Sequence, residues 1–311
     1  DIYGQEQAKR ALIIAASGFH NIHLRGVPGA GKTMLCRAFI SILPPMEKEE
    51  ILEVSKIYSI SRLLNKKQFI TTRPFRSPHH TTSRIGLIGG GTNPTPGEIS
   101  LAHRGVLFLD EFPEFPRSVL EALRQPLEDG IVTISRSLGS ITFPSRFLLL
   151  AASNPCPCGF LGHPKKTCHC SPSSIIRYKK RLSGPILDRI DIHIDLPPVD
   201  EEKLTQYTGG KKSIEIKKQV VLAQERQKER FKNTSIKTNG EMTTKEIKEY
   251  CRLTSEAESL LKQAISRFSL SARSYFKIIK VAQTIADLEG KEKIEASFIA
   301  EALQFRLNDE N

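Results

Sequence analysis

Short apolar runs alternate with stretches of helical periodicity over the first 200 residues of the chain. The segments "NIHLRG" (21–26), "VLFL" (106–109) and "FLLLAAS" (147–153) predict strands. The last of them has no polar alternation, which is typical of a strand in a parallel sheet covered on both faces. Apolar positions spaced as on one helix face follow the first run, from 34 to 42, and Pro44 ends them. We therefore expect an α/β domain with a central parallel sheet flanked by helices.

Two further segments of this domain depart from the simple alternation of strand and helix. Residues 75–100 are rich in Gly, Pro, Thr and Ser, and "IGGGTNPTPGE" within them is the least ordered in pattern. Residues 131–143 alternate around Leu138-Gly139 and predict a β-hairpin. Helical patterns are expected over 47–60 and 118–127.

The character of the chain changes after "DLPPVD". Residues 201–240 are polar and lysine-rich, and form a basic linker with one helix. Residues 241–311 predict a small helical lid domain, in which a capping box from Ser255 to Glu258 opens one helix and Ser271 caps the next. We thus expect three parts, with the α/β domain spanning residues 1–200.

Composition and charge narrow the classes of partner. The hydrophobic fraction of 39% and the charged fraction of 26% are those of a globular protein, and no run of about 18 apolar residues predicts a membrane span. A net charge of +12 favours a polyanionic partner, either a nucleic acid or a nucleotide phosphate. The local grouping of the cysteines predicts a reducing cytoplasm. The chain begins at Asp1 without a signal-peptide pattern, so we expect it to be part of a longer protein.

The segment "GVPGAGKT", from Gly26 to Thr33, lies between a predicted strand and a predicted helix. It matches the P-loop pattern, in which glycines let backbone N–H groups turn towards phosphates and the helix adds its positive N-terminal end. Lys32 would reach the β- and γ-phosphates of a nucleotide, and the hydroxyl of Thr33 would bind Mg²⁺. A structural glycine-rich turn is the alternative.

Polar residues follow the other buried strands. Asp110 and Glu111 end one strand, where Asp110 would complete the magnesium shell and Glu111 would polarise the attacking water. Asn154 ends another strand and should lie beside Lys32, because functional groups gather at the carboxyl ends of parallel strands. Arg189 and Arg273 could stabilise charge in the transition state, although each alone is more often a surface or capping residue.

The stretch "NPCPCGFLGHPKKTCHC" (154–170) holds four of the six cysteines. Two C-x-C pairs can supply four thiolates to a tetrahedral Zn²⁺, and the candidate ligands are Cys156, Cys158, Cys168 and Cys170. His163 or His169 could replace one thiolate, and free or disulfide-linked thiols are the alternative to a metal site. We expect a structural role for this loop, which spans residues 155–172.

A P-loop, "LDE", a terminal Asn, "LDR" and "SAR" occur here in the order found in AAA+ ATPases, which the chain resembles. The strings "FRSPHHTTSRIGLIGGGTNPTPGEISLAHRGVLFLDEFPEF" and "RLSGPILDRIDIHI" resemble the magnesium-chelatase-like family known as ComM or YifB. The resemblance covers essentially the whole chain. It implies that Asn154 is sensor 1, Arg189 the arginine finger and Arg273 sensor 2, acting on its own or a neighbour's nucleotide. It also implies an ATP-binding set formed by the adenine-pocket segment and the P-loop with its first helical turn, namely Tyr3, Gly4, Gln5, Gly26, Pro28, Gly29, Ala30, Gly31, Lys32, Thr33 and Met34.

The same resemblance implies a hexameric ring preceded in family members by a Lon-like domain. ComM proteins are DNA helicases that promote branch migration during natural transformation, whereas the similar magnesium chelatase subunits drive a protein partner. In this branch of AAA+ proteins two inserts face the pore, which here would be residues 85–96 and the hairpin tip 136–140. Arg136 is the residue expected to contact a DNA phosphate, with an ordinary surface arginine as the alternative. A non-enzymatic scaffold is disfavoured because Lys32, Asp110 and Glu111 are all present.

Overall fold

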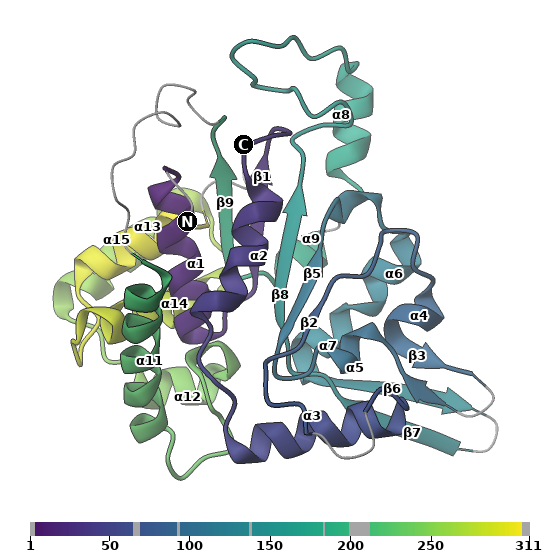
Figure 1. The fold of residues 1–311 in the computed structure, drawn as a ribbon. Helices are drawn as coiled ribbons and strands as arrows, with labels where there is room; N and C mark the ends of the chain where they lie inside the picture. Colours follow the sequence, from purple (N-terminus) through teal and green to yellow (C-terminus); the bar gives the residue numbers. More distant parts are fainter. Residues whose placement is uncertain are drawn as a thin grey trace. The chain divides into compact units, whose positions relative to one another are not determined.

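A computed structural model describes residues 4–64, 69–91, 94–136, 139–182, 184–198 and 212–306 (Figure 1). The chain folds into two compact units. The P-loop unit comprises Leu24–Ile40 and Pro45–Arg189, and the helical unit comprises Asp1–His23, Ser41–Pro44 and Ile190–Asn311. Four predicted features lie outside the described residues, namely Tyr3, Ser137, Leu138 and residues 201–211.

The main sheet has five strands in the order β2-β5-β8-β1-β9, which confirms the predicted central sheet. The strands are β1 (Ile22–Gly26), β2 (Phe75–Arg76), β5 (Val106–Leu109), β8 (Leu148–Ser153) and β9 (Ile192–Leu196). β5 pairs in parallel with both β2 and β8, and Val106 to Leu109 lie opposite Leu148 to Ala151. Every residue of β5 and β8 is buried, as the absence of polar alternation predicts.

The helices of the P-loop unit begin with α2 (Lys32–Ile42) and α3 (Lys48–Ile60), close to their predicted bounds. The single helix expected over 118–127 is instead two short helices, α6 (Arg117–Ala122) and α7 (Arg124–Asp129). Pro126 explains the break, since it has no N–H for the carbonyl four residues earlier and is tolerated only in the first turn of α7. Three further short helices of this unit are η1 (Phe112–Glu114), α8 (Pro172–Lys179) and α9 (Gly184–Leu187).

The stretch expected to be least ordered, residues 88–98, contains a two-stranded antiparallel ribbon of β3 (Gly89–Gly90) and β4 (Thr95–Pro96). It is flanked by α4 (Arg84–Ile88) and α5 (Glu98–Leu101). The predicted hairpin is confirmed as β6 (Ile131–Arg136) and β7 (Gly139–Pro144). The short helix α5 contacts both β4 and β6. Within this unit the two ribbons lie at the end opposite the cysteine-rich loop (Figure 1).

Most helices of the helical unit pack against α14, and α13 packs against α15. The described helices of this unit are α1 (Glu6–Gly18), α11 (Ser213–Arg230), η2 (Asn239–Glu241), α12 (Thr244–Tyr250), α13 (Ser255–Phe268), α14 (Ala272–Glu289) and α15 (Ala296–Gln304). Ser271 caps α14 as predicted, because its hydroxyl accepts the N–H of Ser274. The predicted capping box at Ser255 is wrong. Thr254, one residue earlier, is the N-cap of α13 and accepts the N–H of Ala257.

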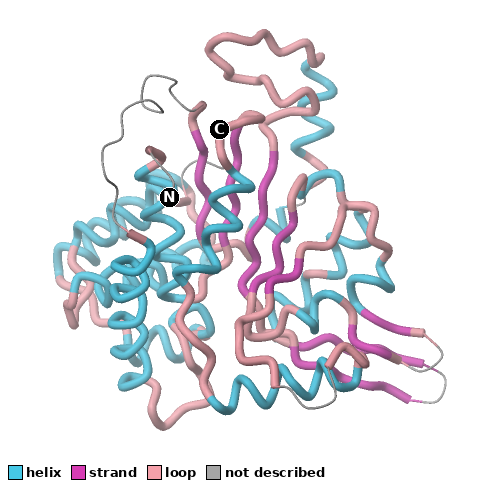
Figure 2. The backbone as a smooth tube through the Cα atoms, viewed as in Figure 1, coloured by secondary structure: helices cyan, strands magenta, loops and turns pink. Residues whose placement is uncertain are grey.

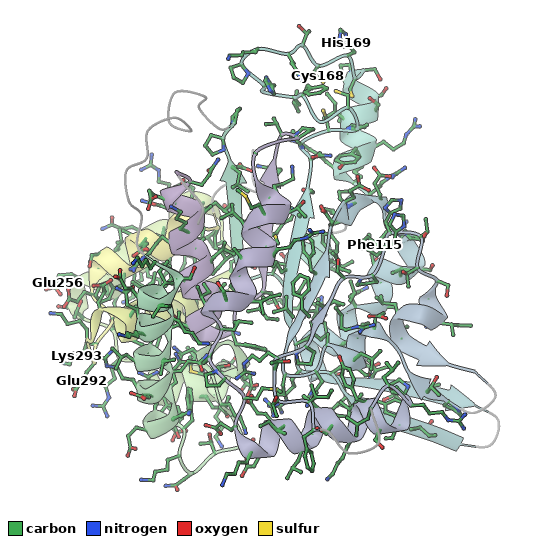
Figure 3. The ribbon with its side chains drawn as sticks, viewed as in Figure 1. Phe115, Cys168, His169, Glu256, Glu292 and Lys293 are labelled. Carbon is green, nitrogen blue, oxygen red and sulfur yellow. The ribbon has the colours of Figure 1, made fainter. Side chains whose placement is uncertain are left out.

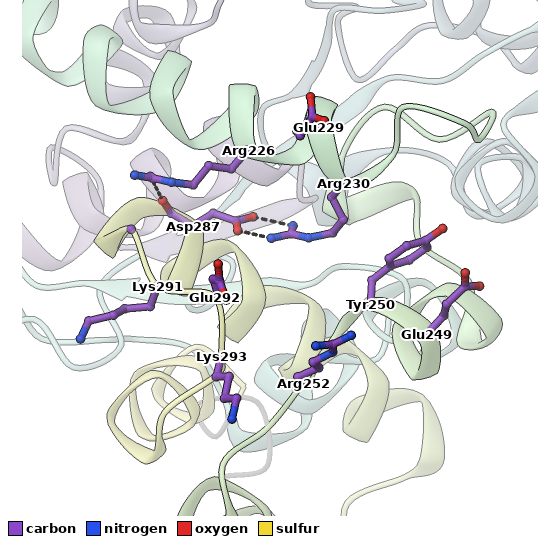
Figure 4. Close-up of a pocket in the computed structure, with 11 residues that line it drawn as sticks. Arg226, Glu229, Arg230, Glu249, Tyr250, Arg252, Asp287, Lys291, Glu292 and Lys293 are labelled. Carbon is purple, nitrogen blue, oxygen red and sulfur yellow. Dashed lines mark hydrogen bonds and ion pairs between the residues drawn. The ribbon is translucent and has the colours of Figure 1, made fainter.

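A buried ion pair closes one side of a polar pocket in the helical unit (Figure 4). Asp287 is fully buried and pairs with Arg230, and the amide of Asn239 donates to the same carboxylate at 2.8 Å. All partners come from this unit, so the network joins α11, η2 and α14. Among the helices in the described part of the chain, none combines the length and the hydrophobicity that a membrane span requires.

Candidate nucleotide-binding site and cysteine cluster

The predicted P-loop is a tight turn between β1, which ends at Gly26, and α2, which begins at Lys32. Gly29 and Gly31 have φ angles of +81° and +84°, a conformation that L side chains rarely adopt. The sequence can therefore make this turn only with glycine at these positions. The turn leaves the first N–H groups of α2 without carbonyl partners inside the helix, which suits an anion at this end.

Lys32 lies at the centre of the turn and contacts the residue that ends β8. Its ammonium donates to the carbonyls of Gly26 (2.5 Å) and Val27 (3.0 Å) and to Oδ1 of Asn154 (3.0 Å). Partial burial lowers the pKa of Lys32, and the charge of Asp110 opposes that shift. The structure thus joins the P-loop lysine to Asn154, as the strand order leads one to expect.

Asp110 and Thr33 bring two oxygen ligands together at the end of β5. The hydroxyl of Thr33 donates to Oδ2 of Asp110 at 3.0 Å, and the N–H of Glu111 donates to Oδ1 of the same carboxylate at 2.9 Å. Hydroxyl and carboxylate oxygens are the ligands that Mg²⁺ takes beside nucleotide phosphates. The donor set therefore fits the Mg²⁺ of a bound nucleotide, which Thr33 and Asp110 would hold.

Glu111 has a strained backbone and an imidazole partner. Its φ of +51° is unusual for a residue with a side chain, and such conformations cluster at functional sites. Nδ1 of His80 lies 3.0 Å from Oε2 of Glu111. Sequence reasoning missed His80, although it lies in the "PHH" string, because no spacing rule links it to a strand end 30 residues away. Its only signal is a pair of histidines in a segment otherwise rich in Gly, Pro, Thr and Ser.

The other predicted site residues are described within their own units. Arg189 belongs to the P-loop unit, where it pairs with Glu128 and donates to the carbonyl of Pro185 at 2.6 Å. Arg273 lies in α14 of the helical unit, and the Gln5 side chain donates to the carbonyl of Pro197 within that same unit. The roles of Arg189, Arg273, Gly4 and Gln5 stay predictions.

The four cysteines of the loop after Asn154 lie together, and their sulfur atoms are all within 4.8 Å of one another. Cys156 is buried, and the other three are half-buried. None of the six cysteines forms a disulfide in the structure. Figure 3 shows Cys168 and His169 in the loop that leads to α8. The group that could hold a metal ion consists of the cysteines alone, without His163 or His169.

Comparison with known proteins agrees with this arrangement. Residues 1–204 match the family described as magnesium chelatase, subunit ChlI, and residues 210–306 match the C-terminal family of the same subunit. The chain is 47% identical over 311 residues to competence protein ComM of Haemophilus influenzae, covering 98% of this chain and 59% of that protein. It is 44% identical over 311 residues to YifB of Salmonella typhimurium, covering 99% and 60%. This chain belongs to the ComM/YifB family of magnesium-chelatase-like AAA+ proteins.

Similarity to the chelatase subunits themselves is weaker. This chain is 27% identical over 172 residues to the 38 kDa magnesium-chelatase subunit of Rhodobacter capsulatus. The match covers 50% of this chain and 49% of that subunit. The chain spans about 60% of the length of the ComM and YifB proteins that it matches. Membership in the family agrees with the central sheet and helical region seen in the structure.

Proposed function

We propose that this protein is the ATP-hydrolysing motor of a cytoplasmic, hexameric DNA translocase, a helicase of the ComM type that drives branch migration during natural transformation. The observation that carries the proposal is the meeting of Lys32 with Asn154 and of Thr33 with Asp110, with Glu111 directly beside them. The proposed cofactors are ATP with Mg²⁺, and a zinc ion in the cysteine cluster.

Each group of the site has a distinct task in this proposal. Lys32 binds the β- and γ-phosphates, while Thr33 and Asp110 hold the magnesium ion that neutralises charge on them. Glu111 accepts a proton from the water that attacks the γ-phosphorus, and the bond from that phosphorus to the bridging oxygen breaks to release ADP. Asn154, whose Oδ1 accepts from Lys32, orients the attacking water in this proposal.

Several features support DNA as the partner. The chain carries a net charge of +12. The β6–β7 hairpin carries a ladder of hydroxyl groups, in which Ser135 and Ser140 lie 3.0 Å apart and Thr133 and Thr142 3.4 Å apart. Five of the six residues of β7 are exposed. Hydroxyl groups and arginines are the side chains that proteins use most against phosphates, and Arg136 ends β6.

A protein-remodelling motor is the second candidate function. It is favoured by the similarity of half the chain to a magnesium-chelatase subunit. The two candidates differ in what stimulates hydrolysis, because a DNA translocase couples turnover to the polyanion and a remodelling motor couples it to a protein partner.

The deciding experiment compares the ATPase rate of the protein with and without single-stranded and branched DNA, followed by a strand-displacement assay. We expect DNA to raise the rate. Glu111→Gln should bind ATP with unchanged affinity and lose about 10²- to 10⁴-fold in turnover. Glu114→Gln is the matched control, since Glu114 lies three residues away and pairs with Arg181. If the assembled protein has the same ATPase rate with and without DNA, the remodelling motor is favoured. Normal turnover in Glu111→Gln would show that another group activates the water.

A further inference from the structure

The sulfur atoms of the cysteine cluster have the spacing of metal ligands rather than of disulfides. Cys156 and Cys158 are 3.5 Å apart, Cys156 and Cys168 are 3.7 Å apart, and Cys158 and Cys168 are 3.6 Å apart. A tetrahedral ion with Zn–S bonds of about 2.3 Å separates its sulfur ligands by about 3.8 Å. A disulfide would need about 2.05 Å. Three sulfurs therefore already form one face of such a tetrahedron, and Cys170 is the fourth member of the group.

Backbone N–H groups around the cluster donate hydrogen bonds to the cysteine sulfurs, which stabilises them as thiolates. The N–H of Leu161 donates to Cys156 at 3.3 Å, and the N–H of Cys158 donates to Cys170 at 3.4 Å. Hydrogen bonds of this kind orient ligands around metals. Nδ1 of His163 instead accepts the N–H groups of Lys165 and Lys166, and His169 is exposed. The histidines therefore do not complete the group.

Burial orders only the first part of the loop, where Cys156 is buried and Gly159 packs on Pro28. The loop contains no helix or strand between β8 and α8 (Figure 2). All of its residues from 161 to 171 are exposed or half-buried, so burial of apolar surface cannot hold this part of it. A four-ligand ion can, because metal binding supplies the free energy that a missing core does not.

One turn of this loop packs on the P-loop. Gly159 has a φ of +82°, and a Cβ at this position would lie 2.6 Å from Cγ of Pro28 and 3.7 Å from Cγ of Asn154. Gly159 directly follows Cys158, and its N–H donates to the carbonyl of Cys156 at 3.0 Å. The metal-binding turn thus contacts both the phosphate-binding loop and the asparagine that receives Lys32.

We propose that Cys156, Cys158, Cys168 and Cys170 bind one structural Zn²⁺, and that the ion positions Pro28 and Asn154 for nucleotide binding through Gly159. The zinc site, named above among the proposed cofactors, does not depend on hydrolysis or DNA binding, whereas the positioning role rests on the proposed binding of ATP at the P-loop. These cysteines are positioning residues, since none of them touches the site of hydrolysis.

The first test measures metal in protein purified without a His-tag. We expect about one zinc per chain, and loss of it in Cys168→Ser but not in His169→Ala, the matched control from the same loop. Cobalt exchanged into the wild-type protein should give the intense visible absorption of tetrahedral thiolate Co²⁺, a readout that does not depend on a folded variant. Zinc below about a tenth of an equivalent would overturn the metal site, and zinc loss in His169→Ala would overturn the ligand set. Iron in place of zinc would overturn the identity of the ion.

The second test separates the positioning role from the metal. Gly159→Ala should keep its zinc and raise the dissociation constant for a fluorescent ATP analogue about tenfold, because its methyl group would displace Pro28. Gly162→Ala is the control, with a φ of +76° and nothing within 4 Å of the added Cβ. Equal affinities in the two zinc-loaded variants would overturn the coupling. Neither measurement uses DNA or hydrolysis, so failure of the motor proposal would not affect them.

Discussion

His80 holds the carboxylate that we propose activates water. Its Nδ1 lies 3.0 Å from Oε2 of Glu111, whose backbone is already in a strained conformation. Because both side chains are partly exposed, water screens the pair, and we expect the loss of this contact to raise the activation free energy of hydrolysis by at most about 1 kcal/mol. We predict that His80→Ala lowers kcat about fivefold with KM for ATP unchanged, as measured in steady-state ATPase assays.

His169→Ala, at an exposed position in the cysteine-rich loop, provides the control for this prediction. His79 cannot serve, because its ring centroid lies 4.1 Å from that of His80. His80→Gln should recover part of the rate, because its amide can still donate to Glu111. If kcat is unchanged in His80→Ala, the contact has no role in positioning Glu111.

The residues of the proposed site differ in how far the sequence could predict them. Lys32, Asp110 and Asn154 each directly follow a buried strand or its turn, and the ends of parallel strands meet at one edge of a sheet. Their proximity was therefore predictable from pattern alone. The contact of His80 with Glu111 was not, because it depends on the path of a glycine- and proline-rich segment that has no periodicity.

At the scale of elements, His103 joins α3 to the segments before β5 and β8. The N–H of Arg146 donates to Nδ1 of His103 at 3.0 Å, so the ring's proton lies on Nε2, which donates to Glu53 at 3.1 Å. The hydrogen bond from His103, helped by Arg104, lowers the pKa of Glu53 to about 2. Burial lowers the pKa of His103 below 6.5, and nearby Arg104 and Arg146 act in the same direction.

Both shifts predict loss of stability in acid. The unfolded chain binds a proton at His103 as the pH falls through 6.5, while the folded protein resists it, so stability declines below that pH. Glu53 adds a second loss as the pH falls from 4.5 towards about 2. We predict that the thermal midpoint falls between about pH 7 and pH 5, and that His103→Ala flattens this dependence. His169→Ala, at an exposed position, should leave the pH dependence of the thermal midpoint unchanged. If His103→Ala has the same pH dependence as the unsubstituted protein, groups other than His103 cause the acid sensitivity.

The β6–β7 hairpin is the element that we propose contacts DNA. If Arg136 binds a phosphate, Arg136→Glu should weaken single-stranded DNA binding equally for all sequences. It should also reduce the slope of log K against log salt by about 1. Arg117→Glu, the same charge reversal at an exposed position on α6, is the matched control. Fluorescence anisotropy over a salt series measures both quantities, and an unchanged slope would remove Arg136 from the DNA contact.

Elements were predictable where a pattern is long and uninterrupted. β5, β8 and α3 follow from runs of four or more apolar residues or from helical spacing. The division of α6 from α7 depends on the single Pro126, and the start of α13 depends on which of two adjacent hydroxyl residues turns towards the helix. The β3–β4 ribbon is two residues long on each side, too short for any periodicity to indicate it.

At the scale of the whole molecule, the proposed ring places two chains at each nucleotide. If Arg189 acts on the ATP of a neighbour, as the family resemblance implies, Arg189→Ala should bind ATP but lose turnover. Mixing it with Glu111→Gln should then restore activity, because some interfaces combine an intact Glu111 with an intact Arg189 from the other chain. A mixture of Lys32→Ala with Glu111→Gln is the control and should stay inactive. Lys32 and Glu111 act on the nucleotide bound to their own chain, so every site in the mixed ring carries one of the two substitutions. If the assembled mixture of Arg189→Ala with Glu111→Gln recovers no ATPase activity, Arg189 acts on the nucleotide of its own chain or has no role in hydrolysis.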